Sequence, residues 1–243
     1  MIQISEMELF DYIRCPLKYQ AQYKIGMALP DNVSFMKLLG QVASSFELSL
    51  MNDTIMHPSH IKRKWDVLCE KHKDIITGKK SLEGISLLMK FYNWARDYKL
   101  RIADLKVPFN YVSVLDGEEN ISVRGEIAGA ISILDTGHAE ILIIDFNHNV
   151  TSPAMVDMKL KYTLDYMAAK KLLGKDVELD GIHVHHVKMN QDVFSVRGEE
   201  ELKRLDITIH NVTKCIYNNL YYPRETAFCI SCFMKNYCRA WRG

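Results

Sequence analysis

The chain has 243 residues, of which 48% are hydrophobic and 25% are charged, so it can bury a sizeable core and is expected to be globular. Its 31 Lys and Arg residues against 30 Asp and Glu residues give a formal charge of +1, which excludes an overall basic field as the means of binding nucleic acid. The N-terminus has no secretion-type pattern, and no stretch reaches the ~18 apolar residues of a membrane span; we therefore expect a soluble, cytoplasmic protein without a membrane partner.

The first predicted element is a helix that begins after Ser5. Ser5 and Glu8 have the spacing of a capping box, and apolar residues follow at helical spacing. The helix is expected to end at Cys15, directly before Pro16. Residues 35–104 then keep mostly helical periodicity, which predicts a helical region.

From Val107 onward the pattern changes to short runs of β-branched and aromatic residues. The runs VPFNYVSVL (107–115), ISVRGEIAGAISIL (121–134) and AEILIIDF (139–146) are separated by turn residues. Three consecutive strands joined by tight turns predict an antiparallel meander.

A helix over 153–174 and a strand over 181–189 follow the meander, because the helix has Pro153 near its start and Gly174 at its end. The order of elements predicts an α/β fold in which helices flank a central mixed sheet. We expect a single elaborated domain that comprises an N-terminal helix (1–30), a helical region (31–105), the sheet and helix core (106–195), and a C-terminal helix with a cysteine-bearing tail (196–243).

Three cysteines lie within ten residues of the tail, CISCFMKNYC, with the spacing C-x2-C-x5-C. Four thiolates suit zinc or an iron–sulfur cluster, and the residues alone favour neither over the other. The fourth ligand must come from a distant position. Cys69 and Cys215 fall within amphipathic helical patterns that favour a core role, whereas Cys15 stands at a helix end from which its side chain can project.

Both ends of the chain carry a family resemblance. The segment S-x-M-x-x-F-D-Y-I-R-C-P-L-K-Y from Ser5, the late Y-Y-P-R and the C-x2-C-x5-C tail resemble the iron–sulfur branch of the PD-(D/E)XK nucleases, which includes the exonucleases of CRISPR adaptation and the AddB- and RecB-type nuclease domains of recombination complexes. The resemblance implies a nuclease-like fold whose two ends are joined at a [4Fe–4S] cluster, with zinc as the alternative. The implied ligands are Cys15, Cys229, Cys232 and Cys238.

Most of the catalytic positions that the resemblance implies are occupied by residues that cannot bind a metal ion or carry the required charge. A nuclease of this kind holds Mg²⁺ or Mn²⁺ with clustered carboxylates and uses a lysine beside the attacking water. Here Ser44 stands at the histidine position, Ala128 at the first aspartate and Asn147 at the lysine; Asp145 is retained. The resembled nucleases also have a Q-x-x-x-Y element on a later helix. Here Tyr162 stands at the glutamine of that element, while Tyr166 matches its tyrosine. We therefore expect a degenerate site, because alanine cannot coordinate a cation and asparagine carries no charge.

Migration of the lost groups is the competing interpretation. Glu126 or Asp157 could replace the acid, and Lys159 or Lys161 could replace the lysine, which would leave an active Mg- or Mn-dependent exonuclease. For Asp145 itself, a structural role as a strand-end residue bonded to turn amides is as consistent with the sequence as a role in metal binding.

A histidine run, HVHHV, places His183 and His185 on one face of a strand and His186 on the other. The sequence shows no nearby Cys, Asp or Glu that would complete a metal site, so we expect surface or packed histidines.

The leading functional hypothesis is a non-catalytic, nuclease-derived iron–sulfur protein that binds DNA or scaffolds a DNA-processing assembly. Cations and rings alternate in the tail and form a candidate nucleic-acid patch, with a solvated tail as the alternative; its members are Lys235, Tyr237, Arg239, Trp241 and Arg242. The other hypotheses are the active exonuclease and a structural subunit that contacts only protein.

Overall fold

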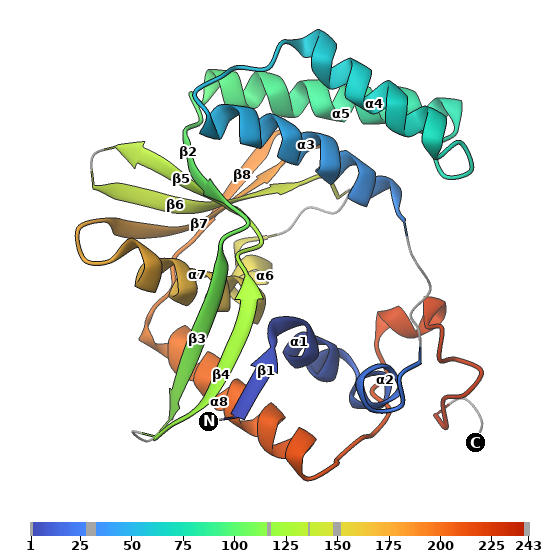
Figure 1. The fold of residues 1–243 in the computed structure, drawn as a ribbon, viewed down its shortest axis with the longest axis vertical. Coiled ribbons are helices and arrows are strands. Elements are labelled where there is room, and N and C mark those ends of the chain that lie inside the picture. Colours follow the sequence, from blue (N-terminus) through green and yellow to red (C-terminus); the bar gives the residue numbers. More distant parts are fainter. Residues whose placement is uncertain (1, 28–32, 116–117, 136, 148–151, 241–243) are drawn as a thin grey trace. The chain divides into compact units, whose positions relative to one another are not determined.

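The computed structural model describes residues 2–27, 33–115, 118–135, 137–147 and 152–240 (Figure 1). The chain divides into two compact units, each assembled from separate stretches of sequence. The first, which we call the terminal unit, comprises 1–31, 108–126 and 198–243; the second, the central unit, comprises 32–107 and 127–197. No helix among the described residues is long and apolar enough to cross a membrane.

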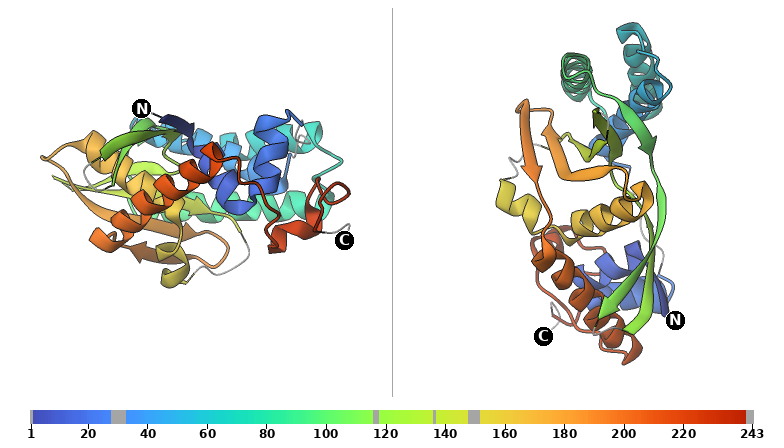
Figure 2. Two further views of the ribbon diagram at one scale, coloured as in Figure 1. Left: turned by 90° about the horizontal axis from the view of Figure 1, so that it is seen from below. Right: turned by 90° about the vertical axis from the view of Figure 1, so that its left-hand side faces the viewer.

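The terminal unit contains a three-stranded mixed sheet in the order β1-β4-β3. β1 (Ile2–Ser5) runs parallel to β4 (Glu118–Glu126), and β3 (Pro108–Leu115) is antiparallel to β4. The helix α8 (Glu199–Tyr217) lies alongside these strands (Figure 2). Asp206 on α8 accepts hydrogen bonds from the Tyr111 hydroxyl at 2.8 Å and the Ser113 hydroxyl at 2.6 Å, which ties the helix to β3.

The N-terminal helices of this unit follow the sequence prediction. α1 (Glu6–Arg14) begins at Ser5, whose hydroxyl accepts from the Glu8 N–H while the Glu8 carboxylate accepts from the Ser5 N–H; the predicted capping box is confirmed. Cys15 ends α1, and α2 (Pro16–Tyr19) starts at the proline. A π-helical turn, η1 (Gln20–Lys24), continues α2, and a 3₁₀ turn, η2 (Ala227–Ser231), lies in the tail.

The central unit contains a five-stranded mixed sheet in the order β2-β5-β6-β7-β8. Only β6 and β7 run parallel; the other neighbours are antiparallel. The strands are β2 (Ile102–Leu105), β5 (Ala130–Asp135), β6 (His138–Asp145), β7 (Glu178–His186) and β8 (Gln191–Ser195).

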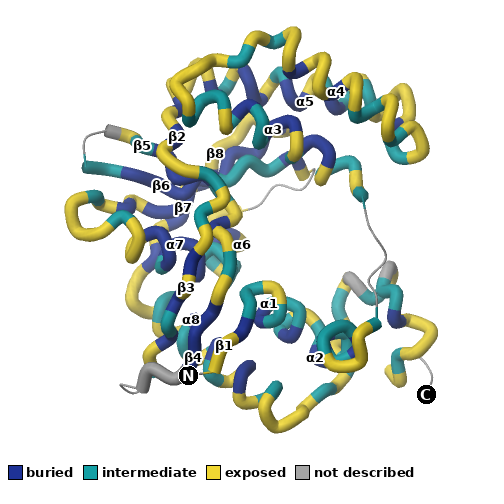
Figure 3. The backbone as a smooth tube through the Cα atoms, in the orientation of Figure 1, coloured by how far each residue is buried: buried dark blue, intermediate teal, exposed yellow. Residues whose placement is uncertain are grey.

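Helices cover both faces of this sheet (Figure 1). One face carries α3 (Phe35–Met51), α4 (Pro58–Lys71) and α5 (Gly78–Asp97), and the other carries α6 (Pro153–Asp157) and α7 (Leu160–Leu173). The main core lies between α3, α4, α5 and the sheet, where Phe46, Phe91 and Leu142 are almost fully buried. Figure 3 shows this burial along the inner side of α3 and along β6 and β7. The predicted α/β class with helix-flanked mixed sheets is confirmed.

The predicted antiparallel meander in one central sheet is wrong. The run over 121–134 is two strands, because β4 ends at Glu126 and β5 begins at Ala130. β4 pairs with β3 and β1, whereas β5 pairs with β2 and β6. At the break, a Cβ on Gly129 would overlap the Leu142 carbonyl oxygen, so this close backbone approach requires glycine. The predicted helix over 153–174 is likewise two helices, α6 and α7.

Candidate functional site

The four cysteines implied as cluster ligands line one small cavity of about 30 Å³ in the terminal unit. Cys15 reaches it from the junction of α1 and α2, and Cys229, Cys232 and Cys238 reach it from the tail. Cys69 lies in the central unit on α4, where its Sγ is 3.4 Å from the Ser81 hydroxyl. The four cysteines that share this cavity are the set that the family resemblance implies.

Hydrogen bonds fasten the tail to the N-terminal helices around the cavity. The Leu17 N–H donates to the Tyr222 carbonyl at 3.1 Å, and the Arg224 guanidinium donates to the Ile13 carbonyl at 2.5 Å. The Tyr12 hydroxyl donates to the Leu220 carbonyl at 2.5 Å. These bonds hold segments some 200 residues apart in the sequence against each other, so the cavity has a fixed frame on both sides.

The donor set around this cavity suits an iron–sulfur cluster in kind, since thiolates from four cysteines are its usual ligands. The Thr226 N–H donates to the Cys229 sulfur at 3.4 Å, the type of contact that tunes a cluster. Lys18, Arg224 and Lys235 also line the cavity, and their positive charge would offset the negative charge of thiolate ligands. Among the residues that the structure describes, no group of three or more His, Cys, Asp or Glu side chains is arranged to hold a single metal ion.

A second cavity, of about 650 Å³, lies in the central unit between α3 and the sheet. Ser44 on α3 and Ala128 before β5 both line it, so two of the degenerate catalytic positions meet in space. Glu47 and Lys106 line the same cavity and were missed by sequence reasoning. Burial raises the pKa of Glu47 to about 7, against the opposing effects of a hydrogen bond with Ser44 and the Lys106 charge. The one signal in the sequence was the helical i, i+3 spacing of Ser44 and Glu47.

Asp145 and Asn147 bond to each other and do not line that cavity. The Asp145 carboxylate accepts from the Asn147 backbone N–H at 2.8 Å and from its side-chain amide at 2.6 Å. Its second oxygen lies 3.3 Å from Nδ1 of His186, the neighbouring residue on β7. These are the contacts of a strand-end residue bonded to turn amides.

The residues considered for migration are engaged in other contacts, and none lines the 650 Å³ cavity. Glu126 belongs to the terminal unit, where its backbone N–H donates to the Glu6 carboxylate at 3.3 Å. Asp157 accepts from the Ser195 hydroxyl at 2.5 Å. The Lys161 ammonium lies 2.6 Å from the buried Asp165 carboxylate, and Lys159 donates to the Tyr162 hydroxyl at 3.3 Å.

The candidate nucleic-acid patch is exposed where the structure describes it. Lys235, Tyr237 and Arg239 are exposed, with 67% of Tyr237 accessible. Arg239 also donates to the Tyr221 carbonyl at 2.7 Å, so part of its role is to hold the tail. Trp241 and Arg242 lie outside the described residues.

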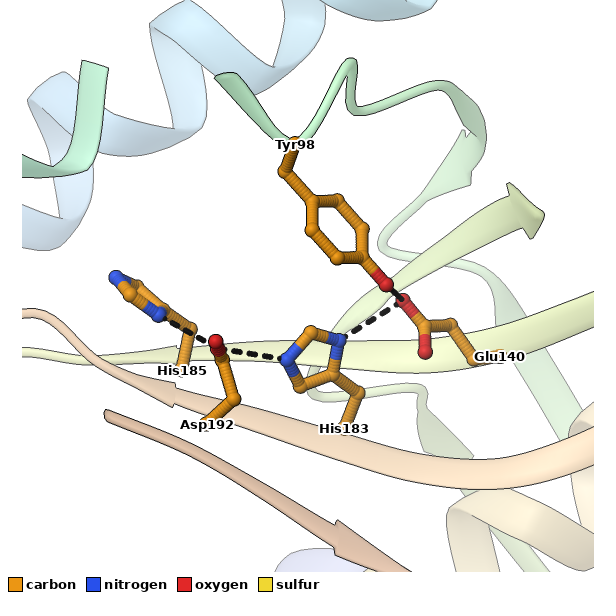
Figure 4. A network of polar contacts seen from close by, with 5 residues as sticks. All are labelled: Tyr98, Glu140, His183, His185 and Asp192. Atoms are coloured by element: carbon orange, nitrogen blue, oxygen red, sulfur yellow. Dashed lines mark hydrogen bonds and ion pairs between the residues drawn. The ribbon is translucent and has the colours of Figure 1, made fainter. Parts of the chain in front are cut away.

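The histidine run is packed inside the central unit, as expected, and the expected alternation is confirmed, but the expected absence of nearby acids is wrong. The His183 ring lies between Glu140 on β6, at 3.0 Å from Nδ1, and Asp192 on β8, at 2.9 Å from Nε2 (Figure 4). His185 Nδ1 lies 2.8 Å from the same Asp192 oxygen. The Tyr98 hydroxyl meets Glu140 at 3.4 Å. The sequence hides this network because it depends on which strands are neighbours.

The geometry around His183 favours a protonated ring. Both ring nitrogens of His183 face carboxylates, and the two nitrogens can donate at the same time only if the ring is protonated. Burial alone would lower the pKa of His183, but the bonds and charges of Glu140 and Asp192 outweigh it and raise that pKa. For His185, burial dominates and lowers the pKa. The surroundings of His183 therefore favour its protonated form, and Phe194 covers the ring at 4.3 Å between ring centres.

No protein-family model and no curated protein matches the chain. A solved structure described as "Crystal structure of SSO0001" is similar to 93% of this chain over 95% of its own length, with a TM-score of 0.34 and 11% sequence identity.

Proposed function

We propose that the protein is a nuclease-derived, catalytically degenerate iron–sulfur protein that binds nucleic acid within a DNA-processing assembly. The observation that carries the proposal is the gathering of Cys15, Cys229, Cys232 and Cys238 around one cavity. They come from opposite ends of the chain and are the four ligands that the family resemblance implies. A cluster there would cross-link the two ends of the chain and couple its binding to folding.

Loss of cleavage is supported by the chemistry of the mapped positions. Ser44 and Ala128 share a cavity that offers neither a histidine nor an aspartate at these points. The retained Asp145 is bonded to Asn147 and faces His186. Because such groups act as a unit, losing an acid and the lysine together removes most of the rate enhancement.

Nucleic-acid binding is assigned to the tail, since Lys235, Tyr237 and Arg239 alternate cation and ring along the sequence and all three are exposed. Ammonium and guanidinium groups neutralise phosphates, and an exposed ring stacks on any base. Such a surface binds without sequence preference and weakens steeply with salt.

The cluster is tested by anaerobic purification followed by iron, sulfide and zinc analysis. We expect about four irons and four sulfides per chain with broad visible absorption, and Cys15→Ser should lose most of the iron. Cys69→Ser is the matched control, because Cys69 lies in the central unit, and it should keep the wild-type content. A colourless protein that contains one zinc would overturn the iron–sulfur assignment.

Nucleic-acid binding is tested with a fluorescent single-stranded oligonucleotide at increasing salt. The variant Lys235→Glu/Tyr237→Ala should weaken binding at least about tenfold and reduce the salt dependence. Lys62→Glu, on the exposed surface of α4 in the central unit, serves as the charge control. Binding at background level in low salt would remove this part of the proposal and favour a subunit that contacts only protein.

One observation favours an active exonuclease as a second candidate: Glu47 and Lys106 supply an acid and an amine in the cavity that holds Ser44 and Ala128. Incubation with Mn²⁺ and single-stranded DNA tests it. Degradation that is lost in Glu47→Gln or Asp145→Ala would establish this candidate in place of the degenerate one.

A further inference from the structure

The 650 Å³ cavity of the central unit has one polar wall, which α3 provides. Lys37, Gln41 and Ser44 line it at spacings of four and three residues, so they occupy one helix face. The opposite face of α3 carries the buried residues of the core, such as Leu39 and Phe46. The volume falls in the range of ~300–1,000 Å³ that small-molecule sites occupy.

The sheet supplies an apolar wall to the same cavity. Leu142, Ile144 and Phe146 line it from β6 and the residue that follows, joined by Ala130 and Leu105 from the neighbouring strands. Leu142 and Phe146 are buried and belong to the main core. The partly exposed members of this wall, Leu105 and Ile144, are the ones that can contact an apolar group of a ligand.

Charge at the cavity favours an anion. Lys37 and Lys106 bring two ammonium groups, against the single carboxyl of Glu47. Because burial raises the pKa of Glu47 to about 7, this carboxyl opposes an anion less than an ordinary glutamate would. The backbone at Lys106 has a φ of 52°, a left-handed conformation that is uncommon for lysine.

We propose that this cavity binds a free, small phosphorylated organic molecule of nucleoside monophosphate size. Its phosphate would face Lys37 and Lys106, and its ring would lie against the partly exposed side chains of Leu105 and Ile144. The Gln41 amide and the Glu47 carboxyl offer donors and acceptors to the edge of a base. All these residues belong to the central unit, so the inference goes beyond the proposed function and does not depend on a cluster or on DNA binding by the tail.

Calorimetric titration of the purified protein with dAMP tests the proposal, with deoxyadenosine and inorganic phosphate as partial ligands. We expect saturable dAMP binding at one site and binding of each partial ligand at least about tenfold weaker. Lys37→Ala/Lys106→Ala should weaken dAMP at least about tenfold. The control, Lys62→Ala/Lys79→Ala, removes two lysines from exposed helix surface and should not change the affinity.

Two further variants separate binding from folding. A Cβ on Gly40 meets no atom within 4 Å, so Gly40→Leu should fold, fill the cavity that Gly40 lines and abolish dAMP binding with no loss of thermal stability. Ionised Glu47 repels the phosphate of dAMP, so the affinity of the wild type for dAMP should fall between pH 6 and 8 as Glu47 loses its proton. Glu47→Gln should remove this contribution to the pH dependence of dAMP affinity. Ionisation of the phosphate itself affects both proteins alike.

Three results would overturn the proposal. They are an absence of saturable dAMP binding, dAMP binding that Gly40→Leu leaves unchanged, and much tighter binding of a 5′-phosphorylated single strand that competes with dAMP. The last result would assign the cavity to a strand end rather than to a free nucleotide. Loss of the cluster in Cys15→Ser with dAMP binding intact would separate this proposal from the function assigned to the terminal unit.

Discussion

His183 shows how a buried residue can hold a charge in this fold. The ring is fully buried, yet each nitrogen meets a carboxylate within 3.0 Å. A buried charge is tolerated only when it is paired and hydrogen-bonded, and Glu140 and Asp192 satisfy both conditions. Removal of the proton would leave two acids facing one neutral ring, which connects the stability of the central unit to pH.

The pH dependence of stability has a definite sign. The pKa of His183 is raised above its ordinary value of 6.5, so its contribution is fully present below pH 6.5 and is lost as pH rises through the folded-state pKa. We predict that the free energy of unfolding of the wild type falls more steeply above pH 6.5 than that of His183→Gln. Urea denaturation at a series of pH values measures both curves.

His60→Gln is the control for that experiment, because His60 is exposed on α4 and its loss should leave a curve parallel to the wild type. His185 acts in the opposite sense, since its lowered pKa makes its contribution decline as pH falls below 6.5. Parallel curves for the wild type and His183→Gln would contradict a protonated His183.

At the residue scale the sequence predicted local chemistry well, and contacts between neighbouring strands poorly. The capping box at Ser5 and Glu8 depends on residues three apart, so its spacing sufficed. Glu140 and Asp192 meet His183 only because β6 and β8 flank β7, and no local pattern encodes that order. Likewise, the sequence around Glu47 is that of an ordinary helix residue, and only the fold shows that Glu47 faces the cavity between α3 and the sheet.

At the scale of elements, two helical glycines have opposite roles. A Cβ added at Gly40 on α3 would meet no atom within 4 Å, whereas at Gly84 on α5 the same carbon would overlap the Trp65 indole from α4. We predict that Gly40→Ala stabilises the protein by up to about 1 kcal/mol, because alanine is the better helix former. Gly84→Ala should destabilise it by about 1–3 kcal/mol through overpacking. Chemical denaturation of the two variants in parallel measures the contrast, and effects of the same sign would refute the packing of α4 on α5.

The attachment of α8 to β3 depends on one carboxylate. Asp206 accepts from both Tyr111 and Ser113, whose side chains are buried. Asp206→Ala leaves two buried hydroxyls without this acceptor, so we predict a loss of about 2–4 kcal/mol in the free energy of unfolding. Tyr111→Phe removes one donor only and should cost about 1 kcal/mol. Equal losses in the two variants would show that Asp206 serves Tyr111 alone.

The type of an element, helix or strand, was predictable where its periodic pattern extended over many residues. The pairing of strands with one another was not predictable. The helices between residues 35 and 97 carry sustained helical spacing and form as expected. In the run over 121–134 the β-branched residues all fall at odd positions on both sides of the break, so nothing in the periodicity marks the break before β5. The steric demand at Gly129 comes from Leu142, a residue of another strand, and becomes visible only in the fold.

At the scale of the whole molecule, both compact units are discontinuous in sequence. The terminal unit joins the two chain ends to the hairpin of β3 and β4, and the central unit takes the stretches between them. Such an arrangement has no linker of distinctive composition, which explains why no boundary is apparent in the sequence. It also means that the ends of the chain must meet before the terminal unit is complete.

Removal of the proposed cluster should therefore affect one unit selectively. A cross-link between Cys15 and the tail closes a loop of more than 200 residues, and in the chain-entropy account a loop of this length contributes about 5 kcal/mol. We predict that iron chelation speeds hydrogen exchange in α1, α2 and residues 220–238 by at least about tenfold. Amides of β6 and β7 should keep their protection, because these strands belong to the central unit. Cys69→Ser, treated in the same way, should match the wild type in both regions. Uniform loss of protection across both units would show that the cluster stabilises the chain as a whole, and unchanged exchange in α1 and the tail would show that the thiols bind nothing that holds the ends together.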